Sequence, residues 1–179
     1  MRSRRARRLF DGLLLPLLAV LTLLAACQAP PRTDQERKAK AYAFYEDCKK
    51  DFPEVREIRP EDALTLLRDG GAVFIDARSE AEQAVSVLPG AIPEKDWLAD
   101  PGRFAGKLAV VYCTVGCRSG LSTRKLAAKG VPAANLAAGI LGWLHAGGPL
   151  VDASGSTTRR VHVYGRNWDL APLAFTAVW

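Results

Sequence analysis

Short apolar runs alternate along the middle of the chain with segments of helix-forming residues. Three runs have the length and composition of strands buried on both faces: 72–77, 108–112 and 134–137. Helices are predicted around them over 60–69, 80–85, 119–129 and 140–145, with shorter helical pieces at 95–98 and 101–104. Strands that alternate with helices predict an α/β fold, in which helices cover both faces of a parallel sheet. In such folds ligands bind beyond the carboxyl ends of the strands.

An N-terminal extension precedes this alternating region. Residues 34–50 predict a helix with Asp34 as its N-cap. Its apolar positions recur at helical spacing and are Ala41, Phe44, Tyr45 and Cys48. We interpret Cys48 as a small buried hydrophobe rather than as a redox group, because free cysteine is among the most buried residue types.

The C-terminal segment has a different pattern. Residues 159–164 alternate in the manner of a half-exposed strand. The residues after them are unusually apolar for a chain end: Trp168, Leu170, Leu173, Phe175 and Trp179. We expect this tail to pack on the domain, and we interpret His145, His162, Trp168 and Trp179 as packing or capping residues rather than ligands. The predicted organisation is a helical extension at 34–55, one α/β domain at 56–151 and a C-terminal extension at 152–179.

The first 26 residues have the composition of an export signal. Five arginines precede a leucine-rich run at 13–24, which is too short for a comfortable transmembrane helix. The run ends in Leu24-Ala25-Ala26-Cys27, which resembles the cleavage box of bacterial lipoproteins. This resemblance implies that residues 1–26 are removed and that lipid on Cys27 holds an exported, periplasm-facing protein at a membrane, with 27–33 as a tether. An uncleaved signal anchor is the alternative.

Charge and cysteine usage narrow the classes of function. Because the signal segment carries five arginines and one aspartate, its removal lowers the formal net charge from +6 to +2. No basic patch with interleaved aromatic residues is left to indicate a nucleic-acid partner. No cysteine pair lies near a histidine in the sequence, so we predict no metal site and no cofactor. With Cys27 acylated, three cysteines remain, and an odd number leaves at least one free thiol.

The segment 110–120 is the candidate functional site. Cys113 follows a buried strand, and a helix begins about five residues later, where backbone amides and the positive end of the helix converge. We therefore expect Cys113 to be a thiolate. Gly116 permits a loop whose N–H groups point inward around the sulfur, Arg118 adds a permanent positive charge, and Ser119 is the predicted N-cap.

Four segments, in order, resemble the rhodanese-homology sulfurtransferases. They are Phe74-Ile75-Asp76-Ala77-Arg78-Ser79, Leu88-Pro89-Gly90-Ala91-Ile92, Tyr112-Cys113 to Arg118-Ser119-Gly120, and Ala138-Gly139-Ile140-Leu141-Gly142-Trp143. The resemblance implies that Cys113 takes a sulfane sulfur from a donor such as thiosulfate and passes it to a thiol or cyanide-type acceptor. Backbone amides of Thr114, Val115, Gly116, Cys117 and Ser119 would hold the persulfide, and Arg118 would favour anionic donors. The protein partner and the physiological donor and acceptor stay open.

Within that resemblance, Asp76 and Arg78 are expected to support the loop. Asp76 would brace the backbone, and we favour an ion pair for Arg78 over a position in the pocket. The loop from Cys113 to Arg118 has six residues, the length associated with sulfurtransferases, whereas related phosphatases and arsenate reductases have one residue more. Val87 stands where many relatives have a histidine that is not catalytic.

Cys117 departs from the family pattern. It could attack a persulfide on Cys113 and form a disulfide within the loop, or it could be a spectator. We favour the spectator, because a disulfide across three intervening residues would strain the loop. The alternative function is a sulfur-carrier or partner-binding module at the envelope that does not turn over, with Cys113 and Cys117 as a redox gate.

Overall fold

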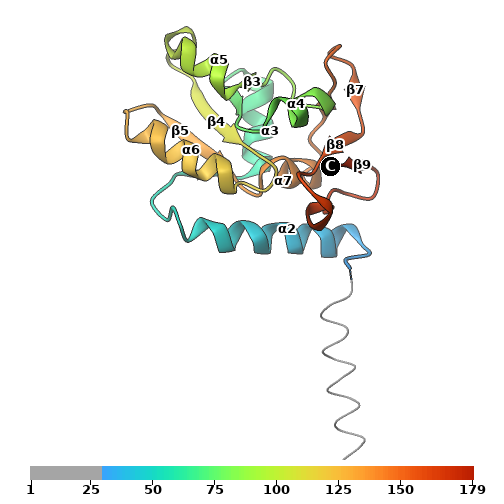
Figure 1. The fold of residues 1–179 in the computed structure, drawn as a ribbon. Helices are drawn as coiled ribbons and strands as arrows, with labels where there is room; N and C mark the ends of the chain where they lie inside the picture. The colour runs from blue at the N-terminus through green and yellow to red at the C-terminus, as the bar shows by residue number, and fades with distance from the viewer. Residues whose placement is uncertain (1–29) are drawn as a thin grey trace, which may run out of the picture. The chain divides into compact units, whose positions relative to one another are not determined.

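A five-stranded parallel sheet forms the centre of the domain (Figure 1). The computed structural model describes residues 30–179, so the signal segment and Cys27 lie outside the described residues. The strands lie in the order β1 (Glu57–Ile58), β5 (Ala133–Leu136), β4 (Leu108–Tyr112), β2 (Ala72–Asp76) and β3 (Ile92–Pro93). This arrangement confirms the predicted α/β class with a parallel sheet.

Successive side chains of the central strands point to opposite faces and build two separate cores. Phe74 and Val110 pack on one face with α3 (Pro60–Asp69) and α7 (Gly139–His145). On the other face Ile75 and Val111 pack with residues of α5 (Glu94–Ala99) and α6 (Cys117–Ala127). Because every one of these strand residues is buried, the strands read as continuous apolar runs. The remaining elements of the domain are α4 (Glu80–Val85), the 3₁₀ turn η1 (Pro101–Phe104) and β6 (Leu150–Val151).

The N-terminal helix α2 (Asp34–Lys49) packs against α6 and α7 (Figure 1). Ala41 and Tyr45 are buried, and Phe44 is partly buried. The predicted N-cap is wrong by one residue. Thr33 caps the helix, because its Oγ1 accepts a hydrogen bond from the Glu36 amide while the Glu36 carboxylate accepts one from the Thr33 amide. Asp34 instead accepts a hydrogen bond from the Leu173 amide and so contacts the C-terminal extension.

The C-terminal extension folds as β7 (Thr157–Thr158), β8 (Arg160–His162), η2 (Arg166–Trp168) and β9 (Thr176–Val178). Val161, Val163 and Leu170 are buried in the same core as α7. Leu173 and Trp179 are more than half exposed, so these two apolar residues do not share in the packing. No helix within residues 30–179 is both long and apolar enough to cross a bilayer.

A disulfide between Cys48 and Cys117 joins α2 to the first residue of α6. This pairing corrects the prediction for Cys48, which is not a free buried thiol. It also leaves Cys117 without a free thiol that could form a disulfide with Cys113, which agrees with the favoured interpretation that Cys117 does not attack a persulfide. The two residues are 69 positions apart in the sequence, and the packing of α2 on α6 brings their α-carbons to 5.6 Å. That separation suits a disulfide. Among the described residues Cys113 is the free cysteine.

The disulfide should contribute about 2 to 4 kcal/mol to the free energy of unfolding, because it closes a long loop in the unfolded chain. Cys48→Ser should therefore lower that free energy by this amount in urea denaturation under non-reducing conditions. Reductant should lower the stability of the wild type by a similar amount and leave Cys48→Ser unchanged. Equal stabilities of the wild type and the variant without reductant would contradict the pairing.

Candidate active site

The loop from Cys113 to Arg118 is held from outside by the start of α7. The amides of Ile140 and Leu141 donate hydrogen bonds to the carbonyl oxygens of Cys113 (2.8 Å) and Thr114 (3.2 Å). Gly139 makes this approach possible, because a Cβ at that position would lie 2.4 Å from the Cys113 carbonyl oxygen. With these carbonyl groups directed toward α7, the N–H groups of the loop are free to face its interior.

Gly116 gives the loop its turn and its contact with α2. Its φ of 96° lies in the left-handed region that favours glycine, and a Cβ there would come within 2.8 Å of the Tyr45 ring. Gly116 is also the N-cap of α6, so the helix begins at Cys117, two residues before the predicted start. Ser119 is therefore not the N-cap. It lies in the first turn and is completely buried.

The Cys113 sulfur is buried at the N-terminus of α6, with 1% of the residue exposed. The Gly116 amide donates a hydrogen bond to Sγ at 3.2 Å, and Ser119 Oγ lies 3.5 Å from Sγ. The amides of Cys117, Arg118 and Ser119 belong to the first turn of the helix, where they have no intrahelical acceptor. Of the five amides expected to hold a persulfide, that of Gly116 contacts the sulfur, whereas those of Thr114, Val115, Cys117 and Ser119 make no hydrogen bond to it.

Asn135 of β5 fixes the direction of the Ser119 hydroxyl. Its Nδ2 donates to the Gly116 carbonyl at 2.9 Å, so its Oδ1 must accept the hydrogen bond from Ser119 Oγ at 2.7 Å. A hydroxyl has one hydrogen, which leaves Ser119 Oγ with a lone pair for Cys113. The Ser119 oxygen can thus accept a hydrogen bond from a Cys113 thiol. No sequence pattern indicated Asn135, because only the pairing of β5 with β4 brings it to the loop.

Arg118 forms a two-point ion pair with Glu82 of α4. Its Nη1 and Nη2 donate to Oε2 (2.8 Å) and Oε1 (2.6 Å), and Nη2 also donates to Thr114 Oγ1. Burial alone would raise the pKa of Glu82, but the hydrogen bonds from Arg118 and Ser79 outweigh it and lower that pKa to about 2. The positive charge of Arg118 is therefore compensated inside the protein. By donor count, its Nε–H and one Nη1–H stay available to a ligand.

Asp76 and Arg78 form a buried brace beside the loop. Arg78 Nη2 lies 2.7 Å from Asp76 Oδ2, and the Tyr112 hydroxyl donates to the same oxygen at 2.6 Å. Arg78 also donates to the Ser86 carbonyl, so the brace joins β2 and β4 to the chain after α4. The ion pair favoured for Arg78 is present. Burial and the negative charge of Asp76 hold the pKa of Tyr112 well above its ordinary value.

A cleft of about 170 Å³ opens over the sulfur. Its lining comes from the loop and from the C-terminal extension: Cys113, Thr114, Val115, Cys117, Arg118, Tyr164 and Trp168. The ring of Tyr164 lies over the Arg118 guanidinium, with 5.0 Å between the guanidinium carbon and the ring centroid. Sequence reasoning missed Tyr164 and treated Trp168 as a packing residue, because no local pattern shows where the tail returns.

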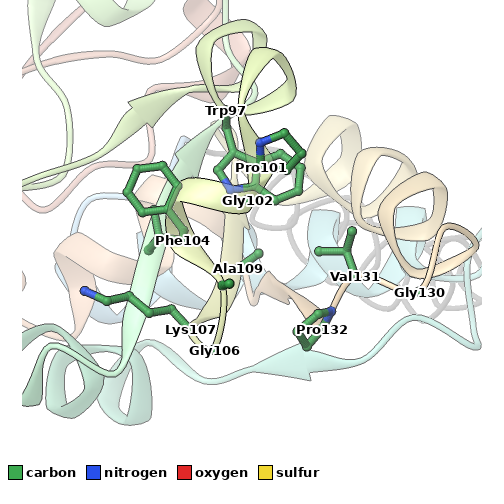
Figure 2. A pocket seen from close by; sticks show the side chains of 12 residues that line it. Trp97, Pro101, Gly102, Phe104, Gly106, Lys107, Ala109, Gly130, Val131 and Pro132 are labelled. Carbon is green, nitrogen blue, oxygen red and sulfur yellow. The ribbon is translucent and has the colours of Figure 1, made fainter.

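A second cavity, of about 280 Å³, lies near the amino ends of β2 and β4 (Figure 2). Trp97, Phe104, Val131 and Pro132 are among its lining residues, and Trp97 Nε1 is buried without a hydrogen-bond partner in the described part of the chain. Cys113 follows the opposite end of β4, so this cavity is separate from the candidate active site. Within residues 30–179 no three His, Cys, Asp or Glu side chains are placed to hold a metal ion.

Glu82 should stabilise the fold above its ordinary pKa of 4.5, and this contribution should disappear as the pH falls toward 2, because its pKa is lowered in the folded state. Glu82→Gln should lower the free energy of unfolding at pH 7 by about 2 to 3 kcal/mol. Urea denaturation at several pH values should show the difference from the wild type shrinking between pH 4.5 and pH 2. The exposed Glu80 provides the matched control, since Glu80→Gln should change stability little. A difference that stays constant down to pH 2 would contradict this role.

Comparison with known proteins places this site in a family. A family model described as a rhodanese-like domain matches residues 59–146. The chain is 34% identical over 97 residues to tRNA uridine(34) hydroxylase of Ruegeria pomeroyi, covering 49% of this chain and 32% of that protein.

A solved structure is also similar. Thiosulfate sulfurtransferase from Pseudomonas aeruginosa superposes with a TM-score of 0.51 at 27% identity, covering 67% of this chain and 24% of the other. The chain thus spans about a third of the curated relative and about a quarter of the sulfurtransferase chain. The match includes the whole loop from Cys113 to Arg118, and residues 59–146 of this chain belong to the rhodanese-like domain family.

Proposed function

We propose that this protein is a sulfurtransferase that carries sulfane sulfur as a persulfide on Cys113. The observation that carries the proposal is the position of Sγ, 3.2 Å from the Gly116 amide and beside the unpaired first-turn amides of α6. A negative sulfur is stabilised at such a place by N–H donors and by the helix dipole. The rhodanese-like domain supports sulfur transfer in general. Thiosulfate as a donor is the finer part of the proposal, supported by the likeness to the Pseudomonas aeruginosa enzyme.

The reaction proceeds in two displacements at sulfur. The Cys113 thiolate attacks the outer sulfur of thiosulfate, the S–S bond of the donor breaks, and sulfite leaves with the electron pair. The outer sulfur is now bound to Cys113 as a persulfide anion, within reach of the first-turn amides of α6. An acceptor such as cyanide then attacks that sulfur, the persulfide bond breaks, and thiocyanate leaves while Cys113 returns to the thiolate.

Arg118 acts in this scheme chiefly as a positioning residue. Its charge is paired with Glu82, so it attracts an anionic donor less strongly than a free guanidinium would. Its two remaining N–H groups can still orient an oxygen of the donor. The activity of the hydroxylase is not carried over to this chain, because the likeness covers 32% of that protein.

Intact-mass measurement after exposure to thiosulfate tests the persulfide. The wild type should gain the mass of one sulfur atom, and Cys113→Ser should gain nothing. The control is Cys27→Ser, the same chemical change away from the loop, which should keep the gain. Absence of the added sulfur in the wild type would contradict the proposal.

Addition of cyanide to the protein that carries the persulfide distinguishes a sulfurtransferase from a sulfur carrier. We expect thiocyanate release, return to the original mass and repeated turnover with excess thiosulfate. Cys113→Ser should reduce thiocyanate formation to background. A persulfide that survives cyanide would instead support the sulfur-carrier or partner-binding module.

The proposed location of this activity is the bacterial envelope, with lipid on Cys27 as the anchor. The Leu24-Ala25-Ala26-Cys27 box supports this, and so does the Cys48–Cys117 disulfide, since disulfides persist mainly in oxidising compartments.

The mass of the protein isolated from bacterial membranes tests the anchor. The mature chain should begin at Cys27 and carry acyl groups that are absent from Cys27→Ser. The wild type should also partition into detergent, and the variant should not. A chain that keeps residues 1–26 and lacks acyl groups would be a signal anchor and would contradict lipidation.

A further inference from the structure

Tyr164 is held in a costly position over the catalytic loop. Its φ of 69° is in the left-handed region, which bulky residues rarely adopt, and 61% of the residue is exposed. The Tyr164 amide donates to His162 Nδ1 at 3.0 Å, which helps to fix this backbone conformation. Neither the backbone strain at Tyr164 nor the exposure of its ring stabilises the folded protein. Strained residues of this kind are concentrated at functional sites.

The ring of Tyr164 and that of Trp168 form one side of the cleft over Cys113. Tyr164 stacks on Arg118 at 5.0 Å, and the Arg118 guanidinium is itself held by Glu82. Trp168 packs against Phe44 of α2, with 4.6 Å between ring centroids. Two groups of neighbouring residues therefore fix the two rings in place. We call Tyr164 and Trp168 the aromatic wall.

Both extensions of the chain support the aromatic wall. Arg37 of α2 forms an ion pair with Asp169 at 3.1 Å and donates to the Ala171 carbonyl at 2.9 Å. The Cys48–Cys117 disulfide fastens the same helix to the catalytic loop. These contacts position aromatic surface beside the sulfur.

The shape and polarity of the cleft indicate what it accepts. Its volume is about 170 Å³, and a cavity of about 150 Å³ is large enough for a benzene ring. The rings of the aromatic wall and the Val115 side chain provide apolar surface, and Arg118, which by donor count keeps two N–H groups for a ligand, lines the same space. Thiosulfate is a small, fully polar dianion and would use none of the apolar surface.

We infer that the aromatic wall is a specificity-determining site for sulfur donors that carry an apolar alkyl or aryl group, of which organic thiosulfonates are the type. This inference rests on the proposed sulfur transfer and names its substrate class. In the first step the Cys113 thiolate attacks the terminal sulfur of the thiosulfonate, the donor S–S bond breaks, and an organic sulfinate leaves with the electron pair. The organic group lies against Tyr164 and Trp168, and an oxygen of the donor accepts from Arg118.

The test compares benzenethiosulfonate with thiosulfate as donors, with cyanide as the acceptor, using the ratio of their kcat/KM values. Tyr164→Ala should lower this ratio three- to tenfold relative to the wild type, because an aromatic contact is lost. Tyr164→Phe should keep the ratio, since the ring remains. The matched control is Leu173→Ala, an exposed apolar residue of the same extension outside the cleft lining. An unchanged ratio in Tyr164→Ala would overturn the inference.

A binding measurement tests the aromatic wall independently of sulfur transfer. Benzenesulfonate, which has no sulfur to transfer, should slow the alkylation of Cys113 by iodoacetamide in the wild type and in Leu173→Ala, and much less in Tyr164→Ala. If neither donor were turned over but this protection held, the proposed function would fail and the aromatic wall would stand as a binding site. Equal protection of Cys113 in the wild type and in Tyr164→Ala, or no protection in the wild type, would contradict the role of the aromatic wall in binding.

Discussion

The two hydrogen bonds from the start of α7 to the carbonyls of Cys113 and Thr114 set the orientation of the whole catalytic loop. By engaging those carbonyl oxygens they leave the loop amides free to face the interior of the loop, where the Gly116 amide contacts the sulfur. Gly139 is what permits the close approach. The carboxyl edge of the sheet, the N-terminus of α6 and the N-terminus of α7 thus meet around one atom.

Local pattern was sufficient to predict the central domain. The strands at 72–77 and 108–112 and the helix at 80–85 could be placed from apolar runs and helix-forming segments, because those signals act within a few positions of the chain. The predicted N-caps of α2 and α6 were wrong. Asp34 and Ser119 are residue types that commonly cap helices, but Thr33 with Glu36 caps α2 and the left-handed Gly116 caps α6. The family resemblance added the identity of the nucleophile, which periodicity alone left open between several chemistries.

Long-range packing decided what the sequence could not predict. The partner of Arg118 lies 36 positions away, the partner of Cys117 lies 69 positions away, and the aromatic wall lies about 50 positions beyond the nucleophile. None of these contacts leaves a periodic signal. Glu82 reaches Arg118 from another element of the same domain, whereas Cys48 and the aromatic wall belong to extensions outside the family domain. The pairing with Glu82 also changes the electrostatics of the site. Arg118 was expected to attract anions, but the carboxylate of Glu82 already compensates its positive charge.

In the proposed function, the disulfide protects the sulfur atom that Cys113 would carry. A free thiol at Cys117, four residues from the persulfide, would be an internal acceptor that removes the outer sulfur as hydrogen sulfide and leaves the loop oxidised. With its sulfur bonded to Cys48, Cys117 has no thiolate to attack with. A sulfur carried by Cys113 would then have no acceptor thiol at Cys117, so the lifetime of the loaded state would depend on acceptors that arrive through the cleft.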